Sequence, residues 1–286
     1  MSAREQLDVA LELISELAPE DQCRLVLIGG QAISFWAHFL FGDGTFTVRE
    51  DQVLTSSDLD IVTDDEESIK ILARSWNGAA RFSELGDHTP NRALIQVPHT
   101  SLSAGYNYTV DVMGDVYGAT AKELVKSSAE IEWDYRGTPI RFRVVSPEML
   151  LWTRIANVGY GRMGAAKNRR DIERAKVLCR IVHEDIMQHA YEIASACNVD
   201  AKKEIKRQIY RRAAFVYRDI AKRKITRKVF ADFPEIIGSY DQSIPKTDFL
   251  SHELYSRAIP GWSGWLHRKV HTIWQHREHR AKEKRQ

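Results

Sequence analysis

Apolar and polar positions near the start of the chain change their period twice. Residues 4–18 carry apolar side chains at helical spacing, which predicts a helix that Pro19 ends. Residues 24–28 form a nearly continuous apolar run, a pattern typical of a buried strand. The run stops at two glycines, and residues 31–41 resume the helical spacing. The chain is therefore predicted to begin with helix, strand, glycine turn and helix.

Further strands are expected, but they do not alternate regularly with helices. Residues 42–57 have the pattern of a polar loop, followed by a strand around residues 59–62 and a helix over residues 66–76. Three more strands are expected at residues 92–97, 107–113 and 140–145. This order predicts an α/β (α+β) domain with a mixed sheet rather than a regular βαβ repeat.

From Pro147 onward the pattern is helical. Pro147 stands at a favoured first-turn position after a serine cap. Helices are expected over residues 148–158, 168–195 and 201–224. We therefore expect a domain boundary near residue 146, between a small mixed-sheet domain over residues 1–146 and a helical domain over residues 147–286.

The net charge of +2 conceals a strong division between the two halves of the chain. Residues 1–150 hold 12 Lys/Arg and 24 Asp/Glu, whereas residues 151–286 hold 29 Lys/Arg and 15 Asp/Glu. An asymmetry of this size favours a polyanionic partner, such as RNA, for the second half. Basic runs are often solvated helix faces, and that alternative stays open.

The end of the chain, residues 262–286, interleaves tryptophans and histidines with basic residues. The histidine spacing would suit a metal ion, but the surrounding Arg and Lys favour a nucleic-acid or solvent-facing surface. Trp262 and Trp265 fit core packing better than base stacking, because stacking platforms usually lie on sheets.

Composition argues against several classes of protein. The chain of 286 residues is 43% hydrophobic and 28% charged, and no apolar run reaches the ~20 residues needed to cross a membrane. Cys23, Cys179 and Cys197 are too few and too widely spaced for a disulfide framework or a zinc site. The acidic amphipathic N-terminus is unlike a signal peptide, so we expect a cytoplasmic protein.

Gly29 and Gly30 stand where a predicted strand turns into a helix. Bare backbone N–H groups at a helix N-terminus bind phosphate, because the donors and the helix dipole both face the anion. Glycine also permits the close approach of a ligand and a positive φ. An ordinary tight turn is the alternative, since glycine is the default turn residue.

Asp58 and Asp60 flank Leu59 in the next predicted strand, so both carboxylates would project from one face. Two carboxylates this close share a metal ion far better than they tolerate each other without one. Oxygen-only ligands favour Mg²⁺ or Mn²⁺ over zinc. The alternative is a polar strand end with helix-capping acids. Ser57, just before the pair, would donate to phosphate or cap the turn.

A single acid, Asp111, interrupts the apolar strand predicted over residues 107–113. If this strand neighbours the one that holds Asp60, three carboxylates converge on a two-metal site for phosphoryl chemistry. Asp111 would then bind the second metal and take the proton of an acceptor hydroxyl. Asp115 is the competing candidate, but it follows Gly114 and is expected beyond the strand.

The order of strand, Gly-Gly, helix, Asp-x-Asp and a later single Asp resembles the polymerase-β-like nucleotidyltransferase superfamily. Residues 27–37 and 54–61 look most like its AbiEii-like branch, which includes toxins of bacterial toxin–antitoxin and phage-defence systems. The resemblance is specific over residues 25–62 and looser beyond them, and it ends near residue 160.

By this resemblance, the glycine pair would hold the triphosphate of an NTP, Asp58 and Asp60 the metals, and Asp111 the catalytic position. The implied reaction is transfer of a nucleotide from the NTP onto RNA, notably a tRNA 3′ end. An antitoxin protein is an implied partner.

The second half departs from the family pattern. The lysine expected in the helix after the last strand is replaced by Arg154, and the stretch from Arg170 to Arg174 lacks the second Asp of the family motif. Arg154, Lys167 and Arg170 are candidate triphosphate contacts, or else they are surface charges on helices.

The sequence therefore predicts a metal-dependent nucleotidyltransferase that acts on RNA. Two alternatives stay open. One is the same enzyme class with a protein or a small molecule as acceptor. The other is a catalytically idle fold that binds nucleic acid or a partner protein. No motif indicates which NTP is used.

Overall fold

The structure is a computed structural model that divides into two compact units. It describes residues 2–42, 45–56, 58–84, 87, 89–98, 108–161, 164–195 and 198–245. Unit 1 is Met1–Thr153 and unit 2 is Arg154–Gln286. The division falls within helix α7 (Pro147–Tyr160), and the boundary expected at residue 146 falls just before this helix.

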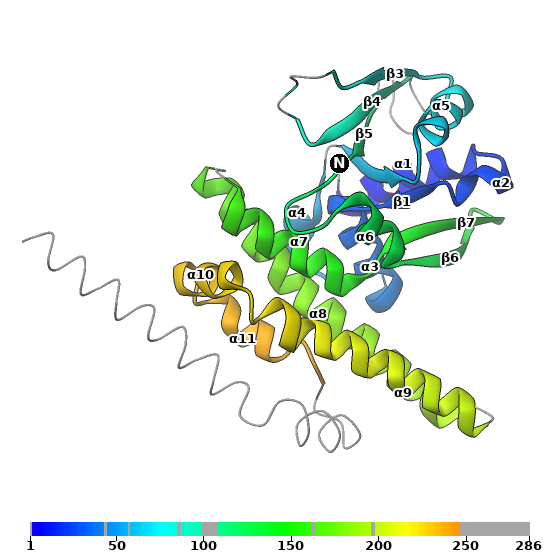
Figure 1. The fold of residues 1–286 in the computed structure, drawn as a ribbon. Helices are drawn as coiled ribbons and strands as arrows, with labels where there is room; N and C mark the ends of the chain where they lie inside the picture. The colour runs from blue at the N-terminus through cyan, green and yellow to red at the C-terminus, as the bar shows by residue number, and fades with distance from the viewer. Residues whose placement is uncertain are drawn as a thin grey trace, which may run out of the picture. The chain divides into compact units, whose positions relative to one another are not determined.

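Unit 1 is built on a seven-stranded sheet in the order β3-β4-β5-β2-β1-β7-β6 (Figure 1). The strands are β1 Leu25–Leu27, β2 Leu59–Thr63, β3 Ala79–Phe82, β4 Asn91–Val97, β5 Tyr108–Met113, β6 Ser128–Tyr135 and β7 Thr138–Val145. Two pairs, β2 with β5 and β1 with β7, are parallel, and the other neighbours are antiparallel. The predicted mixed α/β sheet is therefore confirmed, although edge strands β3 and β6 were not expected.

The helices of unit 1 differ from the predicted ones at several points. They are α1 Ala3–Ser15, α2 Pro19–Gln22, α3 Gly29–Phe41, α4 Val48–Leu54, α5 Glu66–Ser75, α6 Ala121–Lys126 and the start of α7. The first helix ends at Ser15, and Pro19 begins α2 because proline suits the first helical position. The glycine pair lies inside the first turn of α3 rather than before it.

The polar loop predicted over residues 42–57 was wrong, because it contains α4. Thr47 caps this helix: its hydroxyl accepts from the backbone N–H of Glu50 at 3.2 Å, and the Glu50 carboxylate accepts from the backbone N–H of Thr47 at 3.0 Å. Such a reciprocal pair satisfies two N–H groups that a helix start leaves unpaired. A Thr-x-x-Glu signature therefore marks the helix despite its polar composition.

One face of the sheet is apolar and is covered by helices. A single row of directly paired residues crosses all seven strands: Phe82, Ala93, Val112, Ile61, Leu27, Val144 and Ala129. Phe35 of α3 packs edge-to-face on Phe142 of β7, with ring centroids 5.3 Å apart. Lys70 of α5 lies over the ring of Phe82. Helices α3 and α5 therefore cover this face.

The opposite face is more polar. On β6 and β7 it carries the ion pairs of Arg141 with Glu130 and Glu132. Arg143 of the same face donates to the backbone carbonyl of Val125 at the end of α6, at 2.7 Å. Helix α6, which contacts β2, covers this part of the face.

Unit 2 is helical, as predicted. Its helices after α7 are α8 Ala165–Ser195, α9 Val199–Ala214, the π-helical turn η1 Phe215–Ile220, α10 Lys224–Asp232 and α11 Ile236–Asp241. The single helix expected over residues 201–224 is instead α9 followed by η1, which is held by hydrogen bonds to α11. In the part of the chain that the structure describes, no helix is long and apolar enough to span a membrane.

Some sequence predictions fall on residues that lie outside the described ones. They include the basic tail over residues 262–286 with its tryptophans and histidines, Cys197 and Ser57. The other two cysteines, Cys23 and Cys179, are free thiols.

The contact between α1 and the end of α5 gives a test of the core. The buried indole of Trp76 donates to the carbonyl of Leu13, in the last turn of α1, at 2.7 Å. Trp76→Phe should lower the free energy of unfolding by about 1–3 kcal/mol, because a buried carbonyl loses its donor. Trp133→Phe is the matched control, since its indole N–H makes no hydrogen bond among the described residues. Equal losses in denaturant unfolding of the two variants would contradict the prediction.

Candidate functional site

The turn from β1 into α3 brings the backbone beside Asp60. Ile28 is extended and donates its N–H to the Asp60 carbonyl at 3.0 Å, which continues the β1–β2 ladder by one residue. Gly29 then adopts a left-handed φ of +68° and begins α3. Glycine adopts this conformation at little cost, whereas residues with a side chain do so rarely.

Gly29 is also required by space. A Cβ at this position would lie 1.9 Å from Oδ2 of Asp60 and 2.6 Å from its Cγ. The carboxylate of Asp60 therefore occupies the place where a side chain at residue 29 would begin. From the sequence this glycine is explained by ligand approach and a positive φ, whereas the contact with Asp60 is apparent only in the structure.

The first turn of α3 adds a favourable field at this point. The N-cap residue Ile28 offers no side-chain oxygen, and the first bond of the described helix runs from Ala32 N to Ile28 O at 3.2 Å. The amides of Gly29, Gly30 and Gln31 thus precede Ala32, the first helical donor, as the first amides of any helix do. The positive end of the helix dipole therefore lies beside the Asp60 carboxylate, where it stabilises negative charge.

Asp111 lies directly opposite Asp60 on the neighbouring strand. β2 and β5 are parallel and adjacent, and Asp60 pairs with Asp111 between the apolar pairs Leu59–Val110 and Ile61–Val112. Laterally paired residues project from the same face of a sheet, with neighbouring strands roughly 4.8 Å apart. The structure thus brings Asp60 and Asp111 together on the more polar face.

Asp58 is placed differently from the sequence prediction. β2 begins at Leu59, so Asp58 precedes the strand instead of lying within it. It nevertheless lies near the other acids, because its charge raises the pKa of Asp111. The carboxylate cluster consists of Asp58, Asp60 and Asp111, and all three side chains are half-buried.

Burial and like charge both act on the cluster and its surroundings. The pKa of Asp111 is raised, first by burial and then by Asp58, while a hydrogen bond with the Asn91 side chain lowers it. The pKa of the Tyr108 hydroxyl is raised well above its usual value, mainly by burial and then by Asp58 and Asp60. The surroundings of Asp111 thus disfavour its charged form.

Asn91 and Tyr108 are parts of this site that sequence reasoning missed. Asn91 lies at the start of β4, where the β4–β5 register shifts between Asn91 and Ala93. Its contact with Asp111 depends on that shift, which no pattern of apolar and polar residues reveals. Tyr108 stands three residues before Asp111, and a tyrosine in a strand signals ordinary packing.

Asp115, the competing candidate, has a different role. It lies beyond the end of β5, is exposed, and accepts the backbone N–H of Ala121 in the first turn of α6 at 3.0 Å. This placement favours Asp111 as the third acid of the cluster.

The three cationic candidates belong to unit 2. Arg154 pairs with Asp171 at 3.3 Å, and only 11% and 3% of these side chains are exposed, so Arg154 is not a surface charge. Lys167 and Arg170 are exposed on the first turns of α8. A contact of Arg154, Lys167 or Arg170 with a nucleotide stays a prediction.

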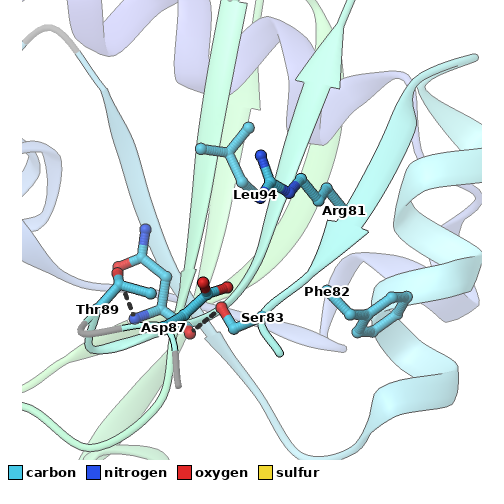
Figure 2. Close-up of a pocket in the computed structure, with 7 residues that line it drawn as sticks. Arg81, Phe82, Ser83, Asp87, Thr89 and Leu94 are labelled. Atoms are coloured by element: carbon cyan, nitrogen blue, oxygen red, sulfur yellow. Dashed lines mark hydrogen bonds between the residues drawn. The ribbon is translucent and has the colours of Figure 1, made fainter. Parts of the chain in front are cut away.

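A shallow hollow of about 330 Å³ lies where β3 and β4 and the described residues between them meet (Figure 2). It is lined by Arg81, Phe82, Ser83, Asp87, Thr89, Asn91 and Leu94. Since Asn91 lines the hollow and also hydrogen bonds with Asp111, the hollow and the carboxylate cluster share a wall. Among the described residues, no group of three or more His, Cys, Asp or Glu side chains is placed to hold a metal ion.

The fit between Gly29 and Asp60 can be tested with two alanines at the two ends of α3. Gly42, the C-cap, has a φ of +73°, close to that of Gly29, but a Cβ there meets no atom of the described residues within 4 Å. Both substitutions place alanine at a positive φ that residues with a side chain rarely adopt, at roughly 1–3 kcal/mol. Gly29→Ala should lose a further ~1–3 kcal/mol in denaturant unfolding, because it must displace Asp60. A loss no greater than that of Gly42→Ala would refute the fit.

The raised pKa of Asp111 predicts that removing its charge stabilises the protein in the absence of metal. With a chelator at about pH 7, Asp111→Asn should have a higher free energy of unfolding than the wild type, because burial and Asp58 disfavour the charged form. As the pH falls through the raised pKa, wild-type Asp111 takes up a proton and the difference should shrink. It should vanish below the unfolded value of about 3.9. A variant less stable than the wild type at neutral pH contradicts this.

Comparison with known proteins adds little. No family model matches the chain, and no curated protein matches it. Among solved structures it is similar to the crystal structure of an antigenic nucleotidyltransferase-like protein from Paracoccidioides brasiliensis, with 14% identity and a TM-score of 0.46. That similarity covers 85% of this chain and 95% of the other. At this TM-score the likeness supports no inference about activity, which must come from the geometry of the carboxylate cluster.

Proposed function

We propose that this protein is a metal-dependent nucleotidyltransferase that moves a nucleotide from an NTP onto RNA. The observation that carries the proposal is the lateral register of Asp60 and Asp111 beside the N-terminus of α3. This arrangement combines a phosphate-binding helix end with paired carboxylates on one sheet face. The resemblance of the sequence to polymerase-β-like nucleotidyltransferases supports the same reaction.

The residues present fit a magnesium or manganese ion. Asp111 has a raised pKa because burial and like charge act on it, and a cation beside it would offset both penalties. Mg²⁺ is usually held by one or two carboxylates, completed by water and substrate phosphates, rather than by an all-protein cage. Asp60 and Asp111, paired across β2 and β5, would supply such a partial shell. When bound, the ion would neutralise charge that develops on the phosphates.

Each part of the site has a role in the proposed reaction. The first amides of α3, from Gly29 to Gln31, bind the triphosphate. Asp111 accepts the proton of the acceptor hydroxyl, whose oxygen forms a bond to the α-phosphorus. The bond from that phosphorus to the bridging oxygen breaks, and pyrophosphate leaves with the electron pair. Catalysis of this kind depends on positioning and on stabilising charge.

The basic character of unit 2 supports RNA as the acceptor. Helix α9 carries six Lys/Arg against two acids, and Lys203 and Arg211 are among its exposed residues. A basic helical face is the usual electrostatic footprint for a nucleic-acid backbone. A tRNA 3′ end as the acceptor and a role as a toxin with an antitoxin partner follow only from the family resemblance.

The proposal predicts Mg²⁺-dependent labelling of RNA. Wild-type protein incubated with Mg²⁺, labelled NTPs and total RNA should transfer label to RNA. Asp60→Asn and Asp111→Asn should each lower the rate by at least about a hundredfold, as loss of a group that acts on the transition state does. Asp115→Asn is the matched control, because Asp115 is an exposed acid outside the cluster.

Other outcomes would select other functions. Labelling of a protein band while RNA stays unlabelled would assign a protein acceptor. Absence of Mg²⁺-dependent NTP binding in calorimetry would assign an idle fold that binds a partner. Transfer by Asp111→Asn equal to that of the Asp115→Asn control would remove the carboxylate cluster from the reaction.

A further inference from the structure

Four residues form one lateral row on the same face as the carboxylate cluster. Arg81 of β3 pairs with Leu94 of β4, Leu94 pairs with Asp111 of β5, and Asp111 pairs with Asp60 of β2. The flanking row, from Phe82 through Ala93 to Val112, faces α5 instead. Because successive residues alternate between faces, the row from Arg81 to Asp60 lies on the more polar side. Arg81 thus lies two strands away from Asp111, and the backbones of the two residues are roughly 10 Å apart.

The hollow lies on the Arg81 side of this row. Its volume of about 330 Å³ falls at the lower end of the range for small-molecule sites, which suits one nucleotide more than a long segment. Arg81 and Leu94 project next to each other beside it, while Phe82 turns away to the other side of the strand (Figure 2).

Most polar groups that line the hollow make hydrogen bonds with the backbone around it. The Ser83 hydroxyl donates to the Asn91 carbonyl at 2.6 Å, and the Thr89 hydroxyl accepts from the Asn91 N–H at 3.2 Å. The Asp87 carboxylate accepts from the backbone N–H of Glu84 at 3.0 Å. Arg81 is exposed and makes no ion pair within the described part of the chain, so its five donors are available to a ligand.

The two sides of the carboxylate cluster are chemically distinct. On one side, next to β2, lies the N-terminus of α3, where the triphosphate is expected. On the other side, next to β4, lies the hollow with Arg81. In-line transfer requires that the hydroxyl attacks the phosphorus on the side opposite the leaving pyrophosphate. The hollow is therefore on the side from which an acceptor must enter.

We propose that the hollow is the acceptor subsite and binds the terminal nucleotide of an RNA 3′ end, with the Arg81 guanidinium on its phosphate. The inference rests on the proposed function and adds the residue that selects the acceptor. Arg81 is suited to this because a guanidinium binds a phosphate through two parallel hydrogen bonds. The terminal hydroxyl then lies beside Asp111, whose carboxylate Asn91 holds in place.

Arg81→Gln tests the subsite, with Arg92→Gln as the matched control. Arg92 is an exposed arginine on the neighbouring strand β4 that does not line the hollow. The assay measures transfer to a synthetic single-stranded RNA oligonucleotide at saturating NTP and Mg²⁺. Arg81→Gln should raise the KM for the oligonucleotide by roughly tenfold to a hundredfold, the usual loss for a charged phosphate contact. The KM for NTP should stay unchanged, and Arg92→Gln should change neither.

Two further measurements guard against a trivial result. Unfolding curves of both variants should match the wild type, because both arginines are exposed. Arg81→Lys keeps the charge without the guanidinium fork, so it should recover part of the affinity for the oligonucleotide.

The remaining outcomes overturn the subsite. Equal KM values for RNA in Arg81→Gln and Arg92→Gln would remove Arg81 from acceptor binding while leaving the nucleotidyltransferase activity in place. A raised KM for NTP instead would assign Arg81 to the triphosphate. Labelling of a protein instead of RNA would also overturn the RNA subsite. Absence of transfer by the wild type to any acceptor would overturn both the subsite and the proposed function.

Discussion

The contact between Gly29 and Asp60 is the constraint on which the rest of the candidate site depends. The Asp60 carboxylate occupies the space of the missing side chain, so the helix end and the acid lie as close as their backbones allow. Asp60 in turn is paired with Asp111, and Asp111 with Leu94 of β4. A displacement at residue 29 would therefore shift Asp60 and, through the paired strands, Asp111 and Leu94.

The carboxylate cluster opposes the stability of the fold that carries it. Burial and then the charge of Asp58 raise the pKa of Asp111, and the hydrogen bond with Asn91 offsets only part of that shift. Apolar pairs on both sides of Asp60 and Asp111 keep the strands in register in spite of it. Such a conflict between local preference and global fold is expected at functional sites.

Much of unit 1 was predictable because its signals are local. The glycine turn, the strand with Asp60 and the strand with Asp111 each follow from a few neighbouring residues. Edge strand β3 was missed because its four residues alternate without a strong apolar side. The partnership of Asn91 with Asp111 was missed for another reason: it depends on which residues oppose each other across two strands. The catalytic and binding roles of the cluster stay predictions.

The register shift in β4 has a consequence for how the sheet can present its residues. Asn91 and Leu94 are three positions apart, so in a regular strand they would lie on opposite faces. Asn91 opposes Met113 and Leu94 opposes Asp111, so the irregularity near Arg92 restores both to one face. One additional residue thus shifts, within a single strand, which residues face each side of the sheet. A regular strand with the same residues would turn the amide of Asn91 toward the helix-covered face and take from Asp111 the side-chain hydrogen bond of Asn91.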